Sequence, residues 1–347
     1  MKFDIGQRPY VIAEIGANHN GDMAIARHLV EAAKTAGADA VKFQSWDTTL
    51  FSKSVYEKNY FLGDDYRQRT DHTLKSIVEA FAISAEQLSM MRDLCHDVGI
   101  AFSSTPFSVA QLDHLVKLDV GYLKIASMDL NNFRLLRAAG ASGLAVVLST
   151  GFGTLAEIDR AVREIEAEGN HNILILHCVS LYPPEDHELN LLNMGMLREA
   201  FGYPVGFSDH SIGIEIPMAA MALGAVAIEK HFTLDKSMFG WDHKVSADPA
   251  ELAAICRGRD RIHAALGSPR RVVGPREMQR RSEYRRSIVA LRRLRAGEIL
   301  DGSMIDFRRP GTGIGPEHAP LILGRRLIRD VGADDLLDFD MFGPASA

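Results

Sequence analysis

The chain has 347 residues, of which 46% are hydrophobic and 24% charged, and its formal net charge is -6 at pH 7. These values are typical of a soluble globular protein with one large or two medium domains, and they exclude a disordered or fibrous chain. The mild negative charge gives no general attraction to nucleic acid or membrane lipid, so any affinity for anions must come from local placement of basic groups.

The three cysteines, Cys95, Cys178 and Cys256, are far apart and form no C-x-x-C pair. This spacing argues against a disulfide framework and against a zinc ribbon. The opening residues carry charged and polar groups where a signal peptide needs an apolar core, and no stretch reaches the length of a membrane span. We therefore expect a cytoplasmic protein.

The first 267 residues alternate short apolar runs, rich in β-branched residues, with helical patterns, which is typical of βαβ units around a parallel sheet. Eight alternations favour a closed (β/α)8 TIM barrel over an open doubly wound sheet, and the turn GANHNGD after the first strand is not a G-x-G-x-x-G loop. Helices are clearest at 23–37, 84–99 and 249–267. The predicted strands cover residues 10–15, 40–44, 100–105, 122–127, 144–150, 173–178, 204–210 and 225–232.

Two segments interrupt this alternation. Residues 45–83 form a connection much longer than a usual βα loop, and such loops are often functional, so we expect it to cover part of the barrel mouth, with a short helix near 73–83. Residues 268–285 are rich in arginine and lack a sustained apolar period, which indicates a linker. The remaining residues, 286–347, predict a small, turn-rich, mostly β module with a limited core.

The reactive groups of a (β/α) barrel lie at the carboxyl ends of its strands, where the βα loops form one open face. Nearly every predicted strand ends in polar residues, whereas stability alone would favour apolar ones. Two lysines and several hydroxyls would suit a small, highly charged anion, such as a phosphate with a carboxylate. For either lysine alone, a rim lysine that reaches water is the simpler interpretation, but a lysine buried in a strand is costly unless it is paired. The residues are Glu14, Lys42, Gln44, Thr105, Lys124, Ser127, Ser149, Thr150, Ser180, Tyr182, Ser208, His210 and His231.

His210 and His231 end two neighbouring strands, so both imidazoles could reach one ion. Neutral imidazole suits manganese, iron, cobalt or zinc, and two protein ligands imply an exchangeable catalytic ion whose shell is completed by water and substrate. The alternative is a pair of rim histidines without a metal. Asp242 and His243 add possible ligands nearby, or contacts to a second substrate.

The motifs VIAEIGANHNGD, AVKFQ, FSSTPF, YLKIAS, LSTG, LHCVSLYP, GFSDH, EKHFTLDK and RRPGTGIGP, taken in this order, closely resemble the sialic acid synthase family, also called the N-acetylneuraminate synthase (NeuB) family. The resemblance spans almost the whole chain. It implies a TIM barrel at 1–267, a linker at 268–285 and an antifreeze-like (SAF) domain at 286–347. It also implies a domain-swapped homodimer.

The same resemblance implies a transferase that condenses phosphoenolpyruvate with an open-chain N-acyl-mannosamine-type sugar. The product would be a nine-carbon 2-keto-3-deoxy acid of the sialic type, with release of phosphate. The ion would be Mn²⁺ or Mg²⁺, held by His210 and His231. Phosphoenolpyruvate would contact Lys42, Thr105, Lys124, Ser127, Ser149, Ser180 and Ser208, and the sugar would contact Gln44, Asp129, Tyr182, Asp242 and Arg309, the last from the partner subunit.

In this scheme Lys42 and Lys124 balance charge, and Glu14 orients or deprotonates the water that adds to the enol carbon. Glu14 could instead only hold the sugar. Asp129, Phe152 and Trp241 depart from the commonest family pattern near the sugar end, so a legionaminic or pseudaminic acid precursor is an alternative to N-acetylmannosamine. Two further alternatives are an inactive sugar-binding scaffold and a synthase of a shorter 3-deoxy sugar acid.

Overall fold

The computed structural model describes residues 8–58 and 73–344. The chain divides into two compact units, the first ending at Gly267 and the second beginning at Ser268. No helix in the described ranges is both long and apolar enough to cross a bilayer.

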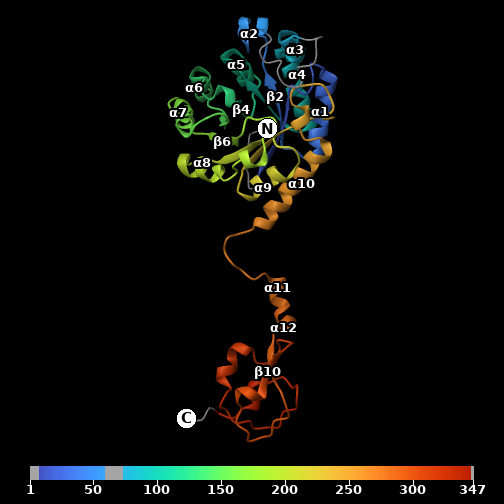
Figure 1. Ribbon diagram of the computed structural model, residues 1–347, viewed down its shortest axis with the longest axis vertical. Coiled ribbons are helices and arrows are strands. Elements are labelled where there is room, and N and C mark those ends of the chain that lie inside the picture. Colours follow the sequence, from blue (N-terminus) through green and yellow to red (C-terminus); the bar gives the residue numbers. More distant parts are fainter. Residues whose placement is uncertain (1–7, 59–72, 345–347) are drawn as a thin grey trace. The chain divides into compact units, whose positions relative to one another are not determined.

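The first unit alternates strands with helices (Figure 1). Its strands are β1 (Tyr10–Gly16), β2 (Ala40–Ser45), β3 (Ala101–Pro106), β4 (Tyr122–Ile125), β5 (Ala145–Ser149), β6 (Ile173–Cys178), β7 (Val205–Asp209) and β8 (Ala227–His231). Its helices are α1 (Met23–Ala36), α2 (Lys53–Lys58), α3 (Leu74–Phe81), α4 (Ala85–Val98), α5 (Val109–Lys117), α6 (Phe133–Ala141), α7 (Leu155–Glu166), α8 (Asn193–Phe201), α9 (Glu215–Ala222) and α10 (Pro249–Leu266).

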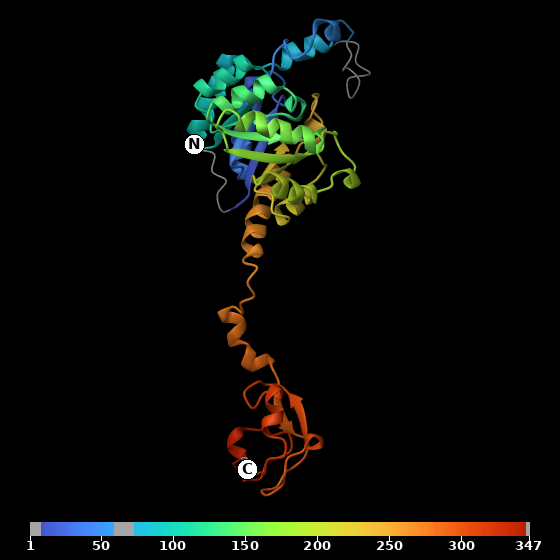
Figure 2. The same ribbon diagram turned by 90° about the vertical axis from the view of Figure 1, so that its left-hand side faces the viewer.

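All eight strands belong to one parallel sheet in the order β3-β2-β1-β8-β7-β6-β5-β4. At the seam between β3 and β4, the Ser103 hydroxyl donates a 2.9 Å hydrogen bond to the Tyr122 carbonyl and joins the two edges. The helices cover the outside of the sheet (Figure 2). The predicted (β/α)8 barrel is therefore confirmed.

Two apolar layers hold the barrel together. The larger one packs the outward side chains of the strands against the helices. The smaller one fills the amino-terminal half of the barrel interior with residues such as Ile12, Ala40, Tyr122, Leu174 and Ala227. Because side chains alternate along a strand, the next inward position on each strand lies one layer nearer the carboxyl ends, where the polar residues are.

The predicted strand at 122–127 is too long. β4 ends at Ile125, and residues 127–129 form a short 3-10 helix, η1 (Ser127–Asp129). Ser127 and Asp129 are therefore carried by the turn above the strand.

The described part of the 45–83 connection packs on the loops that follow β1 and β8. α3 begins with a capping box at Thr73 and buries one face, and Trp46 and Phe81 contact Trp241, with ring centroids 4.8 and 5.7 Å apart. Residues 59–72 of the connection lie outside the described residues.

The second unit contains two short helices, α11 (Pro275–Gln279) and α12 (Arg281–Tyr284), within the segment that the sequence predicts as a linker. An antiparallel pair follows, β9 (Ser287–Ala290) and β10 (Ile305–Arg308), with isolated bridges and 3-10 turns around a small core that includes Ile288, Leu300 and Leu337.

Candidate functional site

The site is a polar layer on the inner face of the barrel. Each strand that contributes to the inner apolar layer carries a polar or sulfur-bearing residue two or four positions later, which alternation directs to the same interior. These residues are Glu14, Lys42, Ser103, Thr105, Lys124, Ser149, Cys178 and Glu229, and Ser208 joins them from β7. All are buried.

Two lysines and two glutamates, from four different strands, form the centre of this layer. Lys42 Nζ lies 2.6 Å from Glu14 Oε2 and 3.8 Å from Glu229 Oε2, and Lys124 Nζ lies 3.4 Å from Glu229 Oε1. Charges so deeply buried persist only when they are paired. The predicted residues Glu14, Lys42 and Lys124 are thus brought together around Glu229.

Burial and charge act in opposite directions on these groups. Burial raises the pKa of Glu14 to about 7, although Lys42 opposes the shift. Burial lowers the pKa of Lys124, although Glu229 opposes it. For Glu229, the two lysines outweigh burial and hold its pKa below the usual value. One carboxyl therefore titrates near neutral pH beside one that stays ionised, which is the arrangement that acid–base chemistry needs.

Hydroxyl groups surround the charges. Lys42 donates a 2.8 Å hydrogen bond to Thr105 Oγ1, and Ser208 Oγ donates a 3.2 Å hydrogen bond to Glu229. Ser149 Oγ is buried without a hydrogen-bond partner, so its donor is free for a bound molecule.

Gly151 brings two of the predicted serines together. Its N–H donates a 3.0 Å hydrogen bond to Ser127 Oγ. A Cβ at this position would lie 2.1 Å from Ser180 Oγ and 2.7 Å from Ser127 Oγ, so only glycine allows this close approach. Cys178 Sγ lies 3.5 Å from Ser127 Oγ and 3.7 Å from Ser180 Oγ.

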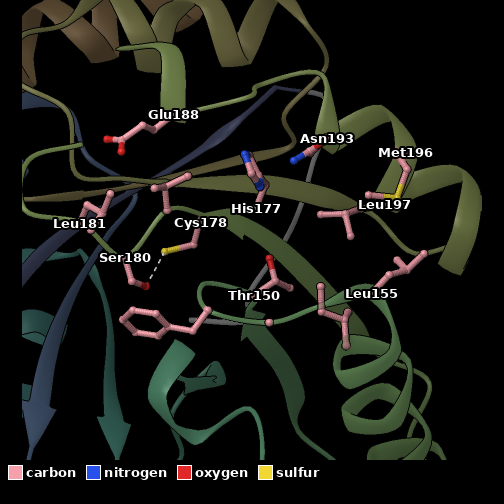
Figure 3. A pocket seen from close by; sticks show the side chains of 14 residues that line it. Thr150, Leu155, His177, Cys178, Ser180, Leu181, Glu188, Asn193, Met196 and Leu197 are labelled. Carbon is pink, nitrogen blue, oxygen red and sulfur yellow. Dashed lines mark hydrogen bonds between the residues drawn. The ribbon is translucent and has the colours of Figure 1, made fainter. Parts of the chain in front are cut away.

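A cavity of about 460 Å³ lies beside this group, between the loops after β5 and β6 and helix α8 (Figure 3). Cys178 and Ser180 point toward each other on one wall, while Leu155, Met196 and Leu197 line the other end. The cavity shares only its inner wall with the polar layer and is otherwise mostly apolar.

The rings of His210 and His231 face each other at the end of the polar layer, with centroids 5.4 Å apart. His210 Nδ1 lies 3.0 Å from the Val179 carbonyl, so its protonated form donates there and leaves Nε2 as a ligand atom. His231 Nδ1 is buried without a hydrogen-bond partner and lies 3.7 Å from Asp242 Oδ2.

These donors fit a first-row divalent ion. Burial lowers the pKa of His231 well below its usual range, which keeps that imidazole neutral as a metal ligand requires. Burial also acts to lower the pKa of His210, but the neighbouring Cys178 and the Val179 carbonyl outweigh it and raise the pKa of that ring. The donor set of two imidazoles with a neighbouring carboxylate suits such an ion. Within residues 8–58 and 73–344, no group of three or more His, Cys, Asp or Glu side chains is arranged to hold a metal by itself, so the shell would need water or substrate oxygens.

The residues predicted to contact the sugar lie around the mouth. The Gln44 amide is close to Gly16, where a Cβ would lie 3.4 Å from Gln44 Cδ and 3.2 Å from Glu14 Oε1. The Tyr182 ring lies 4.1 Å from that of His210, and burial raises the pKa of Asp242 to about 6. Asp129 lies in η1 and accepts a 2.9 Å hydrogen bond from Asn132.

Arg309 belongs to the second unit. Its guanidinium lies 5.0 Å from the ring centroid of Tyr284, and that of Arg280 lies 4.7 Å from the same ring.

Sequence reasoning missed three residues of the site. Glu229 lies two residues before His231 within the apolar run of β8, and alternation from His231 is the signal that places it inward. For Cys178, the sequence indicates only that it belongs to no disulfide framework and no zinc ribbon. Gly151 carries no reactive group, and its role depends on how closely two distant serines approach.

Comparison with known proteins identifies two families along the chain. Residues 29–271 match the model of the NeuB family, and residues 285–343 match that of the SAF domain. The predicted antifreeze-like C-terminal domain is therefore confirmed.

Several relatives match almost the full length. An uncharacterized protein of Methanocaldococcus jannaschii is 39% identical, covering 96% of this chain and 95% of its own. N,N'-diacetyllegionaminic acid synthase of Legionella pneumophila is 36% identical, covering 94% and 93%. Human N-acetylneuraminate-9-phosphate synthase is 32% identical, covering 96% and 92%. Among solved structures, N-acetylneuraminic acid synthetase of Leptospira borgpetersenii superposes with a TM-score of 0.69 at 35% identity, over 79% of this chain and 90% of that one.

Proposed function

Because the chain belongs to the NeuB family, we propose that it is a synthase that condenses phosphoenolpyruvate with an N-acyl-mannosamine-type sugar. The product is a nine-carbon 2-keto-3-deoxy acid of the sialic type, and phosphate is released. The names of the relatives support a synthase of such acids. The observation that carries the proposal is the buried set of Lys42, Lys124, Glu14 and Glu229 beside the facing imidazoles.

Phosphoenolpyruvate supplies the anion that the polar layer fits. Lys42 and Lys124 face its phosphate and carboxylate, and Thr105, Ser127, Ser149, Ser180 and Ser208 donate hydrogen bonds from the surrounding strands. An ammonium group in a buried site stabilises negative charge far more than it would in water. The unpartnered hydroxyl of Ser149 is the clearest donor for this purpose.

A divalent ion, Mn²⁺ or Mg²⁺, would be held by His210 and His231. When bound, it supplies Lewis-acid polarisation of the sugar's carbonyl oxygen. The Val179 carbonyl accepts a hydrogen bond from His210 Nδ1, which leaves Nε2 of that ring as the ligand atom.

The reaction forms a bond between the methylene carbon of phosphoenolpyruvate and the aldehyde carbon of the open-chain sugar. The π electrons of the aldehyde move to its oxygen, which takes up a proton from water and becomes a hydroxyl. The enol carbon then gains cationic character, which the carboxylate of Glu229 can balance. Water adds to that carbon, and phosphate leaves as the C–O bond breaks. Glu14 takes the proton of the water, because burial has raised its pKa into the neutral range.

The sugar occupies the mouth, beside Gln44, Asp129, Tyr182 and Asp242, with Arg309 contributed by the partner subunit of a domain-swapped homodimer in the cytoplasm. One of the relatives is an N,N'-diacetyllegionaminic acid synthase. The corresponding diacetamido sugar is therefore the first alternative to N-acetylmannosamine.

A product assay tests the proposal. The protein is incubated with phosphoenolpyruvate, Mn²⁺ and a panel of N-acylated hexosamines, and phosphate release and product mass are measured. We expect release that requires both metal and sugar, with a product mass that identifies the sugar. Release with erythrose 4-phosphate or arabinose 5-phosphate instead would indicate a shorter 3-deoxy acid, and no release with any sugar would favour a sugar-binding scaffold.

A further inference from the structure

A buried ion pair stands directly behind the two imidazoles. In the parallel pair β7 and β8, Asp209 and Lys230 are register partners, and each immediately precedes one of the histidines. Lys230 Nζ donates a 2.8 Å hydrogen bond to Asp209 Oδ2, and the two side chains are 1% and 0% exposed.

Alternation places this pair on the opposite face of the sheet from the site. One rung earlier, Ser208 and Glu229 point inward and hydrogen-bond to each other at 3.2 Å. Asp209 and Lys230 therefore point outward, toward the helices, and His210 and His231 point inward again. The outward pair thus lies between two inward pairs of the site, Ser208–Glu229 on one side and His210–His231 on the other.

The network holds the chain on both sides of His210. Lys230 Nζ also donates to the Ser211 carbonyl, one residue beyond the histidine. Asp209 Oδ1 accepts hydrogen bonds from the Ser211 N–H at 2.9 Å and the Ser211 hydroxyl at 2.7 Å. The Lys230 side chain therefore binds both residue 209 and residue 211. These contacts fix the peptide groups on either side of His210, which set the direction of its ring.

Stability alone does not explain a charged pair at this place. Taking two charges out of water costs about as much as their attraction returns, and a packed apolar pair often stabilises as well or better. What the ion pair adds is register, because a slip of β8 by one residue would turn His231 outward and separate the charges.

We propose that Asp209, Lys230 and Ser211 form a clamp that sets the separation and orientation of His210 and His231 for binding a divalent cation. This inference rests on the proposed function, because it assumes that the two histidines bind the ion. The clamp residues touch neither the ion nor the substrates, so they are positioning residues.

The test measures the binding of Mn²⁺ alone to the full-length chain, with the free ion quantified by electron paramagnetic resonance. The melting temperature of each variant is measured in parallel. In Asp209→Asn/Lys230→Gln, which keeps hydrogen-bonding side chains without charges, we expect affinity to fall about tenfold or more, as for other residues that orient metal ligands. The matched control is Asp39→Asn. Asp39 pairs with Arg259 at 2.6 Å just before β2, at the opposite end of the barrel, so this variant should lose stability and keep its Mn²⁺ affinity.

Ser211→Ala is a milder second variant that leaves both charges in place. It removes one hydrogen bond from Asp209, and we expect a loss of about two- to tenfold in Mn²⁺ affinity. If the double variant does not fold, this variant decides the question.

The clamp is overturned if a folded Asp209→Asn/Lys230→Gln variant binds Mn²⁺ like the wild type, or if Asp39→Asn loses as much affinity. Wild-type affinity in Ser211→Ala, where the double variant is unfolded, overturns it too. The proposed metal site itself fails if the wild type does not bind Mn²⁺, or binds it no better than His210→Gln/His231→Gln. Only the clamp fails if the wild type binds Mn²⁺ through these histidines and the clamp variants bind it equally well.

Discussion

Glu14 Oε2 lies 2.6 Å from Lys42 Nζ, in an ion pair between the neighbouring strands β1 and β2. The side chain of Glu14 is 1% exposed and that of Lys42 is 2% exposed. The carboxyl keeps a pKa of about 7 in spite of this contact, because burial outweighs the attraction of the lysine. It can therefore accept or release a proton at neutral pH while it remains held in place.

Glu14→Gln tests this role. The amide keeps the shape of the side chain but cannot accept a proton, so we expect turnover to fall by about 10²–10⁴. Binding of phosphoenolpyruvate, measured by calorimetry, should persist because both lysines remain. Glu164→Gln is the control, since Glu164 is also a buried carboxyl in ion pairs, with Arg137 and Arg160 on the helical layer. Near-normal turnover in Glu14→Gln would remove the residue from the proton transfer.

Gly151→Ala tests the serine cluster. The added Cβ would displace Ser127 and Ser180, so we expect the KM for phosphoenolpyruvate to rise while the KM for the sugar changes little. Steady-state kinetics with each substrate varied in turn provide the measurement. Gly195→Ala, in helix α8, is the control, because a Cβ there meets nothing within 4 Å. An equal rise in both KM values would point to a general disturbance of the loop.

The proposed metal ligands are tested by His210→Gln and His231→Gln. Each change removes one imidazole from the facing pair, and we expect loss of bound Mn²⁺ and of nearly all turnover with a folded protein by circular dichroism. His96→Gln, which alters an exposed histidine of helix α4, should behave like the wild type. Full activity in both variants would reject the role of the ion.

Sequence periodicity was sufficient to predict the barrel, since each predicted strand overlaps an observed one within a few residues. Buried parallel strands appear as apolar runs, and capped helices such as α10, with Asp248 before Pro249, have clear starts. The polar residues at the strand ends were also predictable as a group, because the carboxyl ends of all strands in such a barrel lie on the same face.

Other parts of the site depend on distances that periodicity does not contain. The approach of Ser127 and Ser180 around Gly151 joins three loops, and the Asp209–Lys230 pair depends on the register of β7 and β8. In the second unit, the two strands are only four residues long and further β pairing occurs as isolated bridges, so β patterns in the sequence overstate its regular structure.

Arg309→Ala tests the contribution of the second unit. If the partner's Arg309 binds the N-acyl group of the sugar, its loss should raise the KM for the sugar and leave phosphoenolpyruvate binding intact. Truncation after residue 285 should have the same signature. Arg329→Ala is the control, because it removes an arginine of the same unit that forms a surface ion pair with Asp340 at 2.7 Å. Unchanged sugar kinetics in both altered proteins would show that the unit is not part of the site.

His243 predicts a dependence of stability on pH. Its ring is buried, with Nδ1 2.7 Å from Thr233 Oγ1 and Nε2 3.2 Å from Asn20 Oδ1, and burial lowers its pKa to about 4. The unfolded chain has a histidine pKa of about 6.5, so between these values it binds protons that the folded protein does not. The contribution of His243 to the free energy of unfolding is therefore fully present above pH 6.5 and decreases as the pH falls toward 4.

Urea unfolding at pH 7 and pH 5 should show a smaller loss of stability on acidification in His243→Asn than in the wild type, even though the variant is less stable at pH 7. An equal pH dependence in the two proteins would mean that this histidine gains its proton as easily in the folded state as in the unfolded one.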